Sequence, residues 1–138
     1  AATRSTFPSP GDHIILPEII SKEPLGPAVR QGDDQWADIV RWVYNATVTA
    51  EELGVTSSNV DSMKSSNNPE ILRLLGAEGS QGEELGLSKD WAYQIIKQIG
   101  NYSEIFERNI GTSTEIGLER GVNALWTQGG LQYSPPFR

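Results

Sequence analysis

Apolar side chains recur at helical spacing between residues 33 and 54. The positions i, i+3, i+4, i+7, i+8 and i+11 are occupied by Trp36, Ile39, Val40, Val43, Tyr44 and Thr47. This spacing places the side chains on one face of an α-helix. Asp33 is a residue type favoured at the N-cap, and Gly54 is a common residue just beyond a helix end. The pattern therefore predicts a helix over about residues 34–53.

The polar, serine-rich stretch at residues 55–68 that follows has room for one helical turn near Val60. Asn68 and Pro69 then form a start signal, because asparagine caps helices and proline fits the first helical position. We expect a short helix that Gly76 ends. Residues 77–87 contain three glycines and are predicted to be irregular.

The longest helix is predicted over residues 88–109. Its apolar stripe consists of Trp91, Ile95, Ile99, Tyr102 and Phe106. Because the stripe keeps its phase through Gly100, we expect one continuous helix, in which the glycine costs about 1 kcal/mol relative to alanine. Thr114 is a suitable cap for a final helix that Gly129 ends. The apolar positions of that helix are Leu118, Val122, Leu125 and Trp126.

The first thirty residues have a different pattern. Residues 1–12 are predicted to be irregular, and two short apolar runs at residues 13–20 and 25–30 are predicted to be strands interrupted by proline. Two strands alone make a marginal sheet. We therefore expect them to pair with strands outside this chain.

The composition excludes several classes of function. The formal net charge of −7 disfavours both nucleic acid and anionic membranes as partners. No run of eighteen apolar residues is present, so no membrane insertion is expected. The absence of cysteine excludes disulfides, thiolate metal sites and cysteine nucleophiles.

No motif in the chain carries catalytic chemistry. His13 is the only histidine and has no nucleophile motif beside it. No glycine-rich phosphate-binding motif occurs. The acids at residues 33–34 are more typical of a helix cap than of a general acid–base couple, and those at residues 51–52 and 83–84 are more typical of solvated faces than of a cation site. We therefore expect no catalytic residue, no metal ligand and no cofactor, and a protein that is not an enzyme.

Two long runs resemble a known family. The run at residues 13–36, with Glu23-Pro24-Leu25-Gly26-Pro27 at its centre, resembles the segment of periplasmic amino-acid-binding proteins of ABC transporters that returns from the second lobe to the first. The runs at residues 90–111 and 123–136 are similar to the C-terminus of the general L-amino-acid-binding members of that family (solute-binding protein family 3).

The resemblance implies a parent with the α/β type II periplasmic-binding-protein fold. This chain would be a C-terminal part of it, mostly α-helical, with two short strands at its N-terminal end. Residues 1–21 would end the second lobe, residues 22–30 would form the hinge crossing, and residues 31–138 would form the C-terminal helical part of the first lobe. The hinge residues implied are Lys22, Glu23, Pro24, Leu25, Gly26 and Pro27.

The function implied is that of the substrate-binding component of an importer in the bacterial periplasm. Its partners would be a free L-amino acid and the ABC permease, with the ligand-binding residues outside this chain. Within the hinge, Gly26 would be the softest point, because proline restricts the backbone on either side. The alternative is an independent helical protein-interaction module without a transport role. In isolation the chain is expected to self-associate through its uncovered apolar faces.

Overall fold

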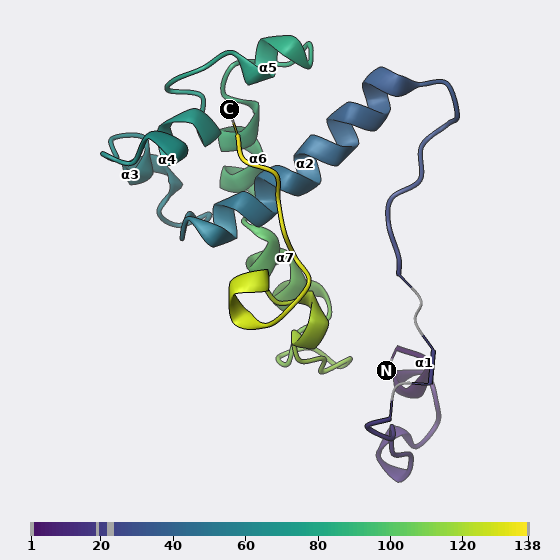
Figure 1. Ribbon diagram of the computed structural model, residues 1–138. Helices are drawn as coiled ribbons and strands as arrows, with labels where there is room; N and C mark the ends of the chain where they lie inside the picture. Colours follow the sequence, from purple (N-terminus) through teal and green to yellow (C-terminus); the bar gives the residue numbers. More distant parts are fainter. Residues whose placement is uncertain (1, 19, 22–23, 138) are drawn as a thin grey trace.

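The computed structural model describes residues 2–18, 20–21 and 24–137. Its α-helices, drawn in Figure 1, are α1 (Ala2–Ser5), α2 (Asp34–Glu52), α3 (Val60–Met63), α4 (Pro69–Leu74), α5 (Gln81–Glu84), α6 (Trp91–Ile99) and α7 (Tyr102–Asn109). Short 3-10 turns lie at Pro10–Asp12, Gly121–Asn123 and Trp126–Gln128. None of these helices is long and apolar enough to cross a membrane.

The central element is α2, which contacts α4, α6 and α7 (Figure 1). The main apolar core consists of Ala46, Ala50, Val55, Val60, Ile71, Leu74, Leu75, Trp91, Ala92, Ile96 and Phe137. The predicted start signals are confirmed, because Asp33 accepts a hydrogen bond from the Trp36 backbone at 3.2 Å and Asn68 accepts one from the Glu70 backbone at 2.9 Å. The helical turn expected near Val60 is also present, as α3.

The apolar stripe of α2 is buried only over its second half. All six residues from Asn45 to Ala50 are buried, whereas Trp36 in the first turn is 51% exposed. The first turn of α2 is therefore not covered by the core of the described residues.

The predicted continuous helix at residues 88–109 was wrong. Helix α6 ends at Gly100, whose φ of +86° and ψ of −177° are not helical. Asn101 then caps α7 and forms a capping box with Glu104, in which each side chain bonds the other residue's backbone N–H. The apolar stripe kept its phase because both helices pack on α2, not because they are one helix.

The final helix predicted from Thr114 does not form. Residues 111–120 are turns and extended chain, and only two 3-10 turns follow, at Gly121–Asn123 and Trp126–Gln128. Leu125 is buried, but Val122 and Trp126 are exposed. The loop is held by backbone bonds such as Leu131 N–H to the Val122 carbonyl at 2.8 Å, so hydrogen bonds across the loop replace the helical ones.

The strands predicted at residues 13–20 and 25–30 are not formed in the described parts of these ranges, where the chain is mostly extended. The described residues between 14 and 29 make no backbone–backbone hydrogen bond. Within residues 1–12, predicted to be irregular, α1 and a 3-10 turn form, and α5 forms within residues 77–87. Figure 1 shows the N-terminal segment lying apart from the helices packed around α2.

Candidate functional site

The predicted hinge is only partly described. Lys22 and Glu23 lie outside the described residues, whereas Pro24 to Pro27 are extended and exposed, with Leu25 97% exposed. Leu25, Gly26 and Pro27 line a groove of about 520 Å³, together with residues that include Tyr44 of α2 and Tyr102 of α7. A Cβ atom placed on Gly26 would meet nothing within 4 Å. The bending of this segment stays a prediction.

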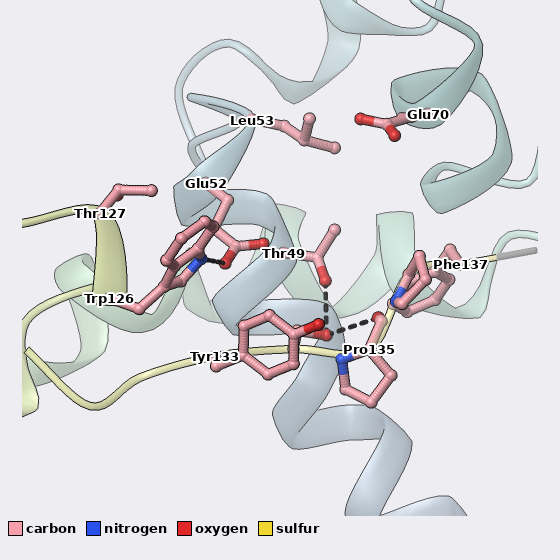
Figure 2. Close-up of a pocket in the computed structure, with 11 residues that line it drawn as sticks. Thr49, Glu52, Leu53, Glu70, Trp126, Thr127, Tyr133, Pro135 and Phe137 are labelled. Atoms are coloured by element: carbon pink, nitrogen blue, oxygen red, sulfur yellow. Dashed lines mark hydrogen bonds between the residues drawn. The ribbon is translucent and has the colours of Figure 1, made fainter.

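A second hollow lies where the C-terminal tail, residues 131–137, crosses α2, and we call it the tail pocket (Figure 2). It has a volume of about 380 Å³. It is lined by Thr49, Glu52, Leu53, Glu70, Trp126, Thr127, Tyr133, Ser134, Pro135, Pro136 and Phe137. This pocket could not be predicted from the sequence, because its residues come from α2, α4, the 3-10 turn at Trp126–Gln128 and the tail, which are far apart along the chain.

The tail is fixed to α2 by polar and aromatic contacts, and the Tyr44 hydroxyl of α2 donates a hydrogen bond to the Gln132 side-chain oxygen. The Thr49 hydroxyl donates a hydrogen bond to the Ser134 hydroxyl oxygen at 2.8 Å, and Ser134 donates to the Pro135 carbonyl at 3.0 Å (Figure 2). Thr49 and Ser134 are both buried. The buried Phe137 ring lies among the side chains of the main core. These contacts hold the tail residues that line the pocket in place.

Glu52 is the half-buried carboxylate of the tail pocket, and one of its oxygens accepts a hydrogen bond from Trp126 Nε1 at 3.0 Å. Burial raises the pKa of Glu52 above its ordinary 4.5, and the negative charges of Glu51 and Glu70 act in the same direction, against the Trp126 hydrogen bond. The Trp126 and Tyr133 rings meet edge to face, with centroids 6.0 Å apart.

The neighbouring acid, Glu51, has a cationic partner. Arg120 Nη2 lies 3.0 Å from both of its carboxylate oxygens, and the side chains are 16% and 9% exposed respectively. The same guanidinium lies over the rings of Tyr102 and Phe106, 5.3 Å from each centroid. Through Arg120, the loop before the tail therefore contacts both α2 and α7.

No arrangement in the described part of the chain is suited to hold a metal ion, since it contains no group of three or more potential ligands. His13 is exposed, bonds the Ser9 carbonyl through Nδ1 at 3.0 Å and packs on the ring of Phe7. Its contacts are those of a surface side chain.

Comparison with solved structures defines the class of protein. The chain matches a periplasmic binding protein of an ABC transporter from Brucella ovis, with glutathione bound, at a TM-score of 0.93 and 58% sequence identity. The match covers 98% of this chain and 43% of that one. The prediction that this mostly helical chain is part of a periplasmic-binding-protein fold is thereby confirmed. No family model matches the sequence.

Two curated relatives are amino-acid-binding proteins. The general L-amino acid-binding periplasmic protein AapJ of Rhizobium johnstonii is 61% identical over 98% of this chain. The glutamate/glutamine/aspartate/asparagine-binding protein BztA of Rhodobacter capsulatus is 59% identical over all of it. The chain spans 40% and 41% of the length of these two relatives. It is therefore a homologue of part of the amino-acid-binding periplasmic proteins of ABC transporters.

Proposed function

We propose that this chain forms part of the substrate-binding component of an amino-acid ABC importer and works in the periplasm without enzymatic activity. The observation that carries the proposal is 61% identity to a general L-amino acid-binding protein over nearly the whole chain. Residues 1–21 would end the second lobe, residues 22–30 would cross the hinge, and residues 31–138 would complete the first lobe.

The uncovered apolar surface supports this role. Ile20 and Leu25 are each 97% exposed on a segment that makes no backbone–backbone hydrogen bond among the described residues, and Trp36 in the first turn of α2 is exposed as well. Extended chain with free backbone groups and aliphatic side chains is suited to join a sheet. The remaining three fifths of a protein of the relatives' length would supply that sheet and cover α2.

Under this proposal the chain contributes the hinge rather than the ligand contacts. Two lobes would close over a free amino acid, and the closed form would dock on the permease. The glutathione in the Brucella ovis structure is compatible with such a site, because glutathione carries a free α-amino and α-carboxylate group at one end, as an amino acid does.

The proposal is tested by calorimetry on a protein of the relatives' full length that contains this sequence. Titration with each of the twenty common L-amino acids and with glutathione is expected to give at least one Kd of about 1 μM. D-enantiomers serve as controls. A folded protein that binds none of them at millimolar concentration would contradict the proposal and would favour the alternative of a helical interaction module.

The hinge assignment has its own test in Gly26→Pro and Gly26→Ala. Proline fixes φ and restricts the preceding residue, whereas the alanine Cβ meets nothing within 4 Å. We expect X-ray scattering of the full-length protein to show ligand-induced compaction in Gly26→Ala and a smaller compaction in Gly26→Pro. Equal compaction in both variants would exclude Gly26 as the hinge point.

A further inference from the structure

Among the described residues, the lining of the tail pocket is negative and includes no compensating cation. Glu52 and Glu70 both line it, and none of its lining residues is lysine or arginine. In the view of Figure 2, Trp126 and Glu70 lie on opposite sides of the hollow. A cation that entered would therefore meet carboxylates and no positive charge of the pocket itself.

Glu52 differs from the adjacent Glu51 in its interaction partners. Glu51 and Glu52 leave the end of the same helix, and both are partly withdrawn from water. Glu51 is paired with Arg120 at 3.0 Å, whereas Glu52 has no cationic partner among the described residues and bonds only the Trp126 indole. A half-buried carboxylate without a counter-charge is costly, and a bound cation would remove that cost.

The aromatic walls favour a particular kind of cation. Trp126 is 55% exposed and Tyr133 is 59% exposed, so both keep ring surface available beside the carboxylate. Aromatic faces attract organic cations, and quaternary ammonium groups most typically, because the ring quadrupole is negative above its plane. Pro135 and Pro136 add apolar surface that suits methyl groups rather than a hydrated metal ion.

We propose that the tail pocket is a binding site for an alkylammonium cation, held between the Glu52 and Glu70 carboxylates and the rings of Trp126 and Tyr133. The volume of about 380 Å³ accommodates a trimethylammonium group with a short chain. The site would be separate from the proposed amino-acid site, whose ligand-binding residues are predicted to lie outside this chain. It stands whether or not the transport proposal is correct.

The probe is choline, titrated calorimetrically into the full-length protein that contains this sequence. Its control is 3,3-dimethylbutan-1-ol, which has the same shape without the charge. All titrations are done in an Arg138→Gln background, so that the guanidinium of Arg138, which lies outside the described residues, cannot compete. Choline is expected to bind at least about tenfold more tightly than the alcohol. It is also expected to shift the NMR signal of the Trp126 indole N–H.

Matched charge variants locate the site. Glu52→Gln keeps an oxygen that can accept from Trp126 and is expected to weaken choline binding about tenfold. Glu83→Gln removes the same charge from exposed α5 and should leave the Kd unchanged. Thermal melts confirm that both variants are folded. Equal binding of choline and the alcohol, equal affinity of Glu52→Gln and Glu83→Gln, or no shift of the Trp126 signal would each overturn the proposal.

Discussion

The ring of Phe137 lies edge-on against the ring of Trp42, with centroids 5.1 Å apart and planes inclined at 76°. On its other side Phe137 stacks on Trp91 of α6, with centroids 6.3 Å apart and planes at 25°. Phe137 of the tail thus packs against both α2 and α6. The contact connects elements that the sequence separates by more than forty residues in each case.

Removal of this ring should destabilise the fold. Phe137→Ala is expected to lower the free energy of unfolding by about 3–4 kcal/mol, because a buried aromatic side chain leaves a cavity between two others. Denaturant unfolding followed by tryptophan fluorescence measures the loss. Phe7→Ala, at an exposed position, should cost less than about 1 kcal/mol. Equal losses would mean that the tail does not hold α2 and α6 together.

The ion pair between Arg120 and Glu51 should matter more than an exposed one. Arg120→Ala would leave the Glu51 carboxylate largely buried without a counter-charge, at an expected cost of about 3 kcal/mol. Arg41→Ala breaks the exposed pair with Asp38 and should cost less than about 0.5 kcal/mol. Chemical denaturation at neutral pH compares the two. Addition of Glu51→Gln to Arg120→Ala should recover part of the loss, and no recovery would contradict the burial argument.

Glu104 should make stability depend on pH at the acidic end. Burial alone would raise the pKa of Glu104, but hydrogen bonds from Ser57 and Asn101 outweigh it and hold the pKa below 4.5. The ionised form is therefore favoured by folding, so this stability is present above pH 4.5 and is lost as the pH falls through the lowered pKa.

The test of this dependence is Glu104→Gln. The variant is expected to be less stable than the parent by about 1–2 kcal/mol at pH 7, with the difference shrinking towards pH 3. Unfolding measured at several pH values gives the profile, and Glu83→Gln controls for the loss of charge. A constant difference across this range would contradict the assignment.

Gly100 is required by the turn between α6 and α7. Its φ of +86° with ψ of −177° is a conformation almost confined to glycine, and an added Cβ would lie 2.7 Å from the Glu104 carboxylate. Gly100→Ala is expected to cost about 2–3 kcal/mol, measured by thermal unfolding. Gly11→Ala, where nothing lies within 4 Å, should be close to neutral. A neutral Gly100→Ala would indicate that α6 and α7 can join into one helix.

The isolated 138-residue chain should self-associate. Ile20 and Leu25 are fully exposed on extended chain, which promotes edge pairing between copies. Sedimentation velocity is expected to show an average mass that rises with protein concentration, and Ile20→Lys with Leu25→Lys should reduce that rise. If the unmutated chain is monomeric at all concentrations, this segment does not cause self-association.

The local features of the fold could be predicted wherever a single residue type carries the information. Asp33 and Asn68 cap helices as predicted, because a side-chain oxygen satisfies a nearby backbone N–H regardless of the rest of the chain. The Asn101-x-x-Glu104 spacing is also a capping-box signal that could have located the break at Gly100. The break was not predicted, because the apolar stripe continues through Gly100 without a change of phase.

The tail pocket, in contrast, depends on contacts between segments that are far apart in the sequence. The resemblance predicts a hinge segment from the sequence alone, and this stays a prediction, whereas nothing in the sequence brought Glu52 together with Trp126 and Tyr133. A pocket of this kind exists only where α2, α4 and the tail meet.

By itself, the sequence determined the starts of α2 and α4, the acidic net charge and the homology to part of a periplasmic amino-acid-binding protein. Only the tertiary structure decided that Leu125 is buried while Val122 and Trp126 are exposed, and that Phe137 joins the core. The physical reason is that apolar spacing records which residues need cover, whereas the partner that covers them is chosen by packing between distant segments.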